Sequence, residues 1–146
     1  MMDLQNEQNE PEIRGMAPYF EVFDMPVTLK FYRDILGFKI IMSSGEGDDV
    51  DWLLLRLNDM ELMFNTAYEK QNRPPAPDPL RTRGHRDVTL YFGCPDTEAL
   101  YEYLINKGLD LKKPSITGHG WKAICLTDPD GYQLCFHWPV EQEGLS

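Results

Sequence analysis

An internal repeat constrains this chain more than any other feature of its sequence. Residues 24–37 read DMPVTLKFYRDILG and residues 96–108 read DTEALYEYLINKG. The opening Asp residues are 72 positions apart and the closing Gly residues 71. Each segment is typical of a helix with a capping Asp and a Gly where the chain leaves the helix. The repeat therefore predicts two copies of one folding unit, with the functional cavity between or within them.

Composition limits the class of protein. A chain of 146 residues with 42% hydrophobic and 26% charged residues is typical of one soluble domain. Its apolar runs are shorter than the roughly 18 residues that span a bilayer, and the acidic N-terminus is unlike a signal peptide. Three widely spaced cysteines (Cys94, Cys125 and Cys135) argue against a disulfide framework and for a reducing compartment. We therefore expect a cytoplasmic protein.

The net charge of −10 bears on the partners. Nucleic acid and anionic membranes carry the same sign of charge, so we expect neither as a partner. A basic ligand is compatible with this charge, although acidity also serves solubility alone.

The chain divides into a core and two tails. We expect a disordered acidic tail at 1–14, one domain at 15–140, and a C-terminal tail at 141–146. Within the domain, the composition predicts module 1 at 16–68, a linker at 69–84, and module 2 at 85–139. The linker holds several Pro residues, so no regular element is expected in it.

Each module is predicted to have the order β-α-β-β-β. Module 1 has expected strands at 16–23, 38–42, 52–57 and 61–65, and a helix at 26–35 with an apolar stripe of Val27, Phe31 and Ile35. Module 2 has expected strands at 88–92, 109–112, 121–127 and 132–138, and a helix at 97–107. The turns are Asn58-Asp59 and Asp128-Pro-Asp-Gly131. The fold class is α+β, with two modules packed through their sheets.

Two strings resemble a known family. FYRDILGF at 31–38 and DPDGY at 128–132 resemble motifs of the vicinal oxygen chelate superfamily, which includes glyoxalase I, extradiol dioxygenases, and fosfomycin- and bleomycin-resistance proteins. The similarity covers about residues 16–139. It implies paired βαβββ modules that form curved mixed sheets around a cleft, in a homodimer. The fold alone does not decide the reaction.

The resemblance also implies four positions for metal ligands. They correspond to Ala17, Glu61, Thr89 and Cys135, of which Glu61 alone keeps a usual family ligand. A metal that activates a substrate needs at least three protein ligands, so we expect no metal and no cofactor. The alternative is a displaced site, in which Glu61 is joined by His85 and His137.

Strand alternation extends these positions to a cleft-facing set. The opposite parity is more continuously apolar and is expected beneath the helices: Phe20, Val22, Leu62, Phe64, Leu90, Phe92, Leu134 and Phe136. The predicted ligand-binding residues are Tyr19, Glu21, Trp52, Glu61, Met63, Tyr91, Trp121, Cys135 and His137. Aromatic residues also fill clefts or dimer contacts, and Trp121 suits either role.

These residues favour a binding protein over an enzyme. The first hypothesis is a metal-independent protein, similar to bleomycin-resistance proteins, that sequesters a cationic or aromatic small molecule. Aromatic faces would stack on the ligand, while Glu21 and Glu61 attract its charge. The second is a lyase, isomerase or dioxygenase that uses the displaced metal site, or Glu61 as general base. The third is a vestigial pocket in a protein that binds another protein.

Overall fold

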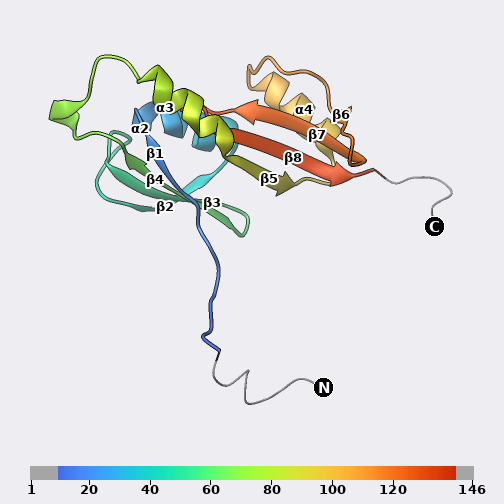
Figure 1. The fold of residues 1–146 in the computed structure, drawn as a ribbon, viewed down its shortest axis with the longest axis horizontal. Helices are drawn as coiled ribbons and strands as arrows, with labels where there is room; N and C mark the ends of the chain where they lie inside the picture. Colours follow the sequence, from blue (N-terminus) through green and yellow to red (C-terminus); the bar gives the residue numbers. More distant parts are fainter. Residues whose placement is uncertain (1–9, 141–146) are drawn as a thin grey trace.

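The computed structural model, which describes residues 10–140, contains two four-stranded mixed sheets of the same design (Figure 1). The first sheet has the order β1-β4-β3-β2, and the second has the order β5-β8-β7-β6. The strands are β1 (Tyr19–Val22), β2 (Lys39–Ser43), β3 (Trp52–Leu57), β4 (Met60–Thr66), β5 (Thr89–Gly93), β6 (Ser115–Ile116), β7 (Trp121–Thr127) and β8 (Gln133–Pro139). In each sheet the first strand pairs in parallel and the other pairings are antiparallel. The predicted α+β repeat is confirmed.

Each module carries one main helix, capped as the sequence indicates. In module 1, α2 (Met25–Leu29) continues into the π-helical turn η1 (Lys30–Ile35), and module 2 contains α4 (Thr97–Asn106). The carboxylate of Asp24 accepts a hydrogen bond from Val27 N at 3.5 Å, and that of Asp96 accepts one from Ala99 N at 3.0 Å. The helices end at Gly37 and Gly108, whose φ angles of 91° and 96° favour glycine.

The buried face of the first helix differs from the predicted stripe at one residue, Val27. Val27 is 46% exposed, whereas Thr28, Leu29 and Tyr32 are buried. Of the other two members of the predicted stripe, Phe31 is buried in the core and Ile35 packs against it, so the structure corrects the stripe at Val27 alone.

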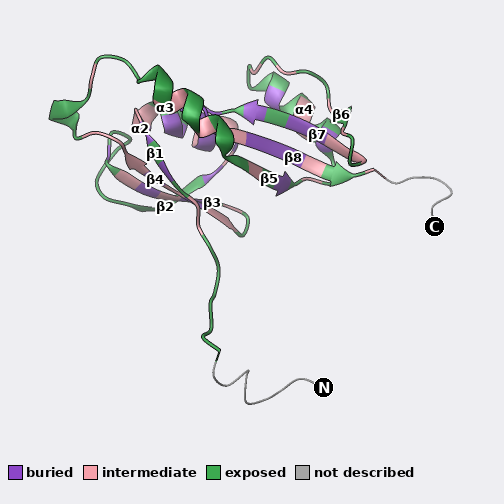
Figure 2. Cartoon of the chain, in the orientation of Figure 1, coloured by how far each residue is buried: buried purple, intermediate pink, exposed green. Residues whose placement is uncertain are grey.

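Alternation along the strands builds one core shared by both modules. The strand residues expected beneath the helices are buried or, for Leu90, partly buried, and they belong to a single apolar cluster (Figure 2). The register inferred from the apolar pattern is therefore correct on both sheets. The opposite face of each sheet, which we call the open face, does not pack against this core.

The linker contains a helix, so the expectation of no regular element there was wrong. Between two 3₁₀ turns, η2 (Lys70–Asn72) and η3 (His85–Asp87), lies α3 (Pro79–Gly84). Asp78 caps this helix by accepting a hydrogen bond from Leu80 N at 2.9 Å. Pro79 stands in the first turn, where its missing N–H has no intrahelical partner to lose.

The strand expected at 109–112 is also wrong. Leu109 and Leu111 pack against the core from an irregular segment, and β6 comes later and pairs only two residues with β7. Pro114, just before β6, has no N–H to donate to a ladder. As a result, the edge of β7 beyond Ala123 has no partner strand, unlike the corresponding edge of β3.

The turn between β7 and β8 joins the modules. Asp128 accepts a hydrogen bond from the hydroxyl of Tyr32 at 2.6 Å, and Asp130 accepts one from Phe23 N at 2.7 Å. A side chain at Gly131 would collide with the backbone of Thr82, so α3 packs directly on this turn. In Figure 1, α3 lies over the region where the two sheets meet.

A ring stack strengthens the same junction. The ring of Tyr132 lies 4.1 Å from that of Phe20 and 4.0 Å from that of His85. Nδ1 of His85 donates a hydrogen bond of 2.6 Å to the carbonyl of Asp130. The modules are thus fixed to each other by contacts between residues distant in sequence.

The predicted tails lie outside the described residues, apart from residues 10–14. Ile13 in this stretch is 85% exposed, and Arg14 pairs with Glu12 at 2.7 Å. Across residues 10–140, no helix has the length and apolar character needed to cross a membrane.

Candidate functional site

Three rings meet on the open face of the second sheet, and we call them the aromatic cluster: Tyr91, Trp121 and His137. The ring of His137 lies 5.3 Å from Tyr91 and 4.3 Å from Trp121, and Tyr91 lies 6.3 Å from Trp121. The strand order explains the cluster, because β8 runs between β5 and β7 and places His137 between the other two rings. Ala123, directly opposite His137, is small and leaves room for it.

The rings offer faces at several angles. Tyr91 is 61% exposed and stands nearly perpendicular to His137, at 83°. Ring faces are the electron-rich surfaces that attract planar groups and cations. This arrangement is suited to holding a flat or positively charged group.

His137 carries an unpaired polar atom. Its Nδ1 is buried and has no hydrogen-bond partner within the described part of the chain. Leaving such an atom unpaired costs about 1–3 kcal/mol. A buried polar group without a partner requires a specific explanation, and one such explanation is that the group binds a ligand.

A hollow of about 290 Å³ next to the cluster brings Glu61 and Tyr91 together. It lies between the start of β1, the β3–β4 turn and β5, with Met16, Pro18, Asp59, Met60, Leu62, Leu90 and Phe92 as its other lining residues. Its walls therefore come from both modules. These other residues are not predictable from the sequence, because a contact between modules leaves no periodic signal.

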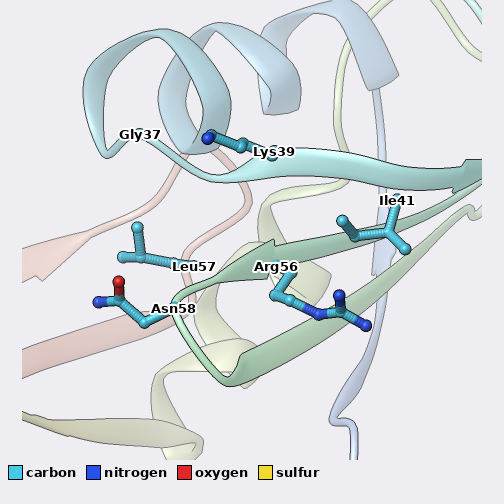
Figure 3. Close-up of a pocket in the computed structure, with 6 residues that line it drawn as sticks. All are labelled: Gly37, Lys39, Ile41, Arg56, Leu57 and Asn58. Carbon is cyan, nitrogen blue, oxygen red and sulfur yellow. The ribbon is translucent and has the colours of Figure 1, made fainter.

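The carboxylate of Glu61 is already paired. It accepts two hydrogen bonds from Arg56, at 3.0 and 2.5 Å, from the directly opposite position on β3. Arg56 also lines a second hollow of about 340 Å³, with Gly37, Lys39, Ile41, Leu57 and Asn58 (Figure 3). Since both side chains are partly exposed, the pair adds little stability, and a ligand cation can compete with Arg56.

The remaining first-sheet residues lie elsewhere on the open face. Tyr19, Glu21, Trp52 and Met63 do not line the hollow that Glu61 shares with Tyr91. Glu21 is exposed and lies 3.9 Å from Arg81 of α3. The structure thus brings together Tyr91, Trp121 and His137 and adds Glu61 through the hollow. Cys135 is the register partner of Tyr91, and the four first-sheet residues lie outside the hollow.

Cys135 is not a free thiol, which corrects the expectation from the cysteine count. It forms a disulfide with Cys125, its direct cross-strand partner, with the Cα atoms 4.1 Å apart. The hairpin register around the DPDG turn contained the signal, since it places these two cysteines opposite each other. Cysteine usage therefore does not favour a cytoplasmic location.

The residues do not fit the metal that the family resemblance implies. Of the four ligand positions, Ala17 and Thr89 offer no usual ligand, Glu61 is bound to Arg56, and Cys135 is in the disulfide. The displaced site is not formed either, because His85 is held at the junction by Asp130 and Tyr132. Within residues 10–140, no three His, Cys, Asp or Glu side chains form a metal-binding group.

The remaining cysteine is poorly suited to catalysis. Burial raises the pKa of the Cys94 thiol, and the nearby Asp96 charge raises it further, although a bond to the Asp96 carbonyl opposes this. A thiol with a raised pKa supplies little of the nucleophilic thiolate.

Comparison with known proteins agrees with the fold. The model of the Glyoxalase/Bleomycin resistance protein/Dioxygenase superfamily matches residues 20–136. Among curated protein sequences, none matches the chain significantly.

Three solved structures illustrate the similarity. A bleomycin-binding protein complexed with bleomycin is 22% identical, with a TM-score of 0.64 over 88% of this chain and 100% of its own. A bleomycin resistance determinant encoded on the transposon Tn5 is also 22% identical, with a TM-score of 0.65 and the same coverage. TnmS3, an antibiotic binding protein from Streptomyces sp. CB03234, is 19% identical, with a TM-score of 0.62 over 89% of this chain and 100% of its own.

Proposed function

The chain belongs to the Glyoxalase/Bleomycin resistance protein/Dioxygenase superfamily, and from this premise we propose that it is a metal-independent protein that sequesters a planar, cationic small molecule. The observation that carries the proposal is the aromatic cluster, in which rings from three strands meet beside the hollow that contains Glu61. Two structural neighbours, a bleomycin-binding protein and an antibiotic binding protein, and a third described as a bleomycin resistance determinant support the binding of a small molecule.

Each part of the site has a distinct role in this proposal. The flat group of the ligand stacks on Trp121 and on the exposed ring of Tyr91, and a cation over such a ring gains about 0.5–2 kcal/mol. The unpaired Nδ1 of His137 supplies a polar contact once the cluster adjusts around a ligand. Glu61 provides negative charge at the other end of the hollow, in competition with Arg56.

The proposal requires no chemical step. The protein acts by holding the molecule, and the net charge of −10 favours a cation at long range. The lyase, isomerase and dioxygenase alternatives need a metal site or a free base, whereas Glu61 is bound to a guanidinium and Cys135 to another cysteine.

We also propose that the protein forms a homodimer. The edge strand β2 exposes Ile40, Ile41 and Met42, and the open faces expose Tyr19 and Tyr91. A second copy would cover these apolar residues and enclose the aromatic cluster. Sedimentation at micromolar concentration is expected to give a dimer, and a single species of 16.9 kDa would contradict it.

The test is equilibrium titration with bleomycin and with aminoacridine, a planar aromatic cation, before and after exhaustive treatment with a chelator. Saturable binding of aminoacridine with the same Kd in both preparations is the expected result. Binding that disappears after chelation and returns with a divalent metal would overturn metal independence. Failure of both compounds to bind would overturn the ligand class.

A further inference from the structure

A third hollow, on the edge of the second sheet, is lined in part by one cysteine of the disulfide. It has a volume of about 380 Å³ and is lined by the irregular segment before β6 and by the edge of β7 that β6 leaves uncovered. Lys112, Lys113 and Cys125 are among its lining residues, together with one acidic residue, Asp110. It lies apart from the hollow that contains Glu61.

The two cysteines differ in accessibility. Cys125 is exposed, whereas Cys135 is only 5% exposed. An incoming thiolate must approach a sulfur atom in line with the S–S bond. The more exposed cysteine is therefore the one that is attacked. Here that cysteine is Cys125, at the wall of the hollow.

The hairpin does not depend on the disulfide. Seven cross-strand residue pairs join β7 and β8, and the turn is fixed by two hydrogen bonds from backbone N–H groups to the Asp128 carboxylate. The disulfide joins residues only 10 positions apart, so it lowers the entropy of the unfolded chain by little. The sheet is therefore expected to survive reduction.

The charge around Cys125 selects the reactant. Two Lys side chains and one Asp give the hollow a net positive charge, in a protein whose total is −10. Positive side chains attract an anionic thiol and stabilise the thiolate form of a nearby sulfur. We propose that this hollow is a binding site for a small anionic thiol, which exchanges with the Cys125–Cys135 disulfide through Cys125.

The exchange is balanced in two steps. The thiolate attacks Cys125 Sγ, the protein S–S bond breaks, and Cys135 leaves with the electron pair and takes a proton from water. A second thiol attacks the mixed disulfide at the sulfur of the small molecule and releases Cys125. Two small thiols are oxidised to one disulfide, and the protein disulfide is reduced by two electrons.

The first test compares three ethanethiols that differ in charge: the anion mercaptoethanesulfonate, the neutral mercaptoethanol and the cation cysteamine. The rate at which each reduces the native protein is divided by its rate with hydroxyethyl disulfide, which removes differences in intrinsic reactivity. The anion is expected to exceed the cation by about tenfold. The Lys112→Glu/Lys113→Glu variant should lose this preference, and Lys30→Glu/Lys39→Glu, which changes the net charge equally on module 1, should keep it.

Two outcomes of that test would overturn the proposal. Equal normalised rates for the three thiols would exclude an anion site. Reduction that requires denaturant would make the disulfide an inaccessible structural bond. Circular dichroism of the reduced protein checks that the fold persists.

The second test identifies the attacked sulfur in a Cys94→Ser background. Cys135→Ser leaves Cys125 free and should form a mixed disulfide with oxidised mercaptoethanesulfonate, as measured by intact mass. Cys125→Ser leaves the buried Cys135 and should react at least about tenfold more slowly. Equal reactivity, or faster reaction at Cys135, would contradict the proposed role of Cys125.

Discussion

The hydroxyl of Tyr32 donates a 2.6 Å hydrogen bond to the carboxylate of Asp128, 96 residues further along the chain. Both residues are buried, and they belong to different modules. Desolvation of Tyr32 and the charge of Asp128 raise the pKa of the phenol well above its usual value, so the phenol stays protonated and remains the donor. The contact links the two halves of the repeat directly.

Removal of this donor should destabilise the junction. We expect Tyr32→Phe to lower the free energy of unfolding by about 1–3 kcal/mol, because Asp128 would remain buried with one hydrogen bond fewer. Urea denaturation measures the change. Tyr103→Phe, at a residue 41% exposed on α4, serves as the control and should change stability by less than about 0.5 kcal/mol.

Asp130 should give the protein an unusual dependence on pH. Burial raises the pKa of this carboxyl from 3.8 to about 6, and the charge of Asp128 contributes, against the bond from Phe23 and the charges of His85 and Arg81. The folded state therefore binds the proton more tightly than the unfolded state. Its contribution to stability is complete below pH 3.8 and is lost as the pH rises through about 6.

The measurement for Asp130 is the difference in unfolding free energy between wild type and Asp130→Asn as a function of pH. Wild type should lose on the order of 2–3 kcal/mol relative to the variant as the pH rises through this window. In Asp48→Asn the difference should stay constant in this window and change with the opposite sign below pH 3.8, since Arg33 lowers the pKa of Asp48. A constant difference for Asp130→Asn would contradict the assignment.

Gly131 should tolerate no side chain. Its φ is 92°, and a Cβ there would collide with the backbone of Thr82. Gly131→Ala is expected to cost more than about 2 kcal/mol, whereas Gly47→Ala, with φ 75° and open space around it, should cost only about 1 kcal/mol. Thermal denaturation of both variants tests the packing of α3 on the turn. Equal losses would show that backbone strain alone is responsible.

Substitution of Glu61 and substitution of Arg56 should have opposite effects on the affinity for a cationic ligand. Glu61→Gln should weaken aminoacridine binding by about 1–3 kcal/mol and leave binding of uncharged acridine nearly unchanged. Arg56→Gln should strengthen binding of the cation, because it removes the competitor for the carboxylate. Calorimetry with both compounds at two salt concentrations is the measurement. If both compounds lose affinity equally in Glu61→Gln, Glu61 supports the strand and has no electrostatic role.

Local signals account for the correct part of the fold prediction. The capping residues Asp24 and Asp96, the glycines after the helices, and the alternation on the central strands depend on neighbours in sequence, and the structure has all of them. Two failures arose where a local rule was applied too broadly. The prolines of the linker at 69–84 predict no regular element, although Pro79 suits the first turn of α3. Leu109 and Leu111 indicate a strand, although they pack against the core without pairing.

The candidate site was less predictable for a different reason. Strand parity places Tyr91 and His137 on one face, with Trp121 as a further candidate on a hairpin strand, and in the structure the three rings meet. Parity cannot show how two sheets sit relative to each other, so it did not separate Glu21 from the hollow beside Glu61. Strand parity also does not show that Arg56 binds the carboxylate of Glu61, because this ion pair depends on the rotamers of the two side chains.

Titration calorimetry of aminoacridine into wild type and Trp121→Ala tests the binding claim most directly. The account predicts saturable binding to wild type and an affinity at least about tenfold lower in Trp121→Ala, equivalent to about 1.4 kcal/mol. Tyr103→Ala, which removes an exposed ring away from the cluster, should bind like wild type. Equal affinity in wild type and Trp121→Ala would contradict the account, because the ligand would then sit away from the aromatic cluster.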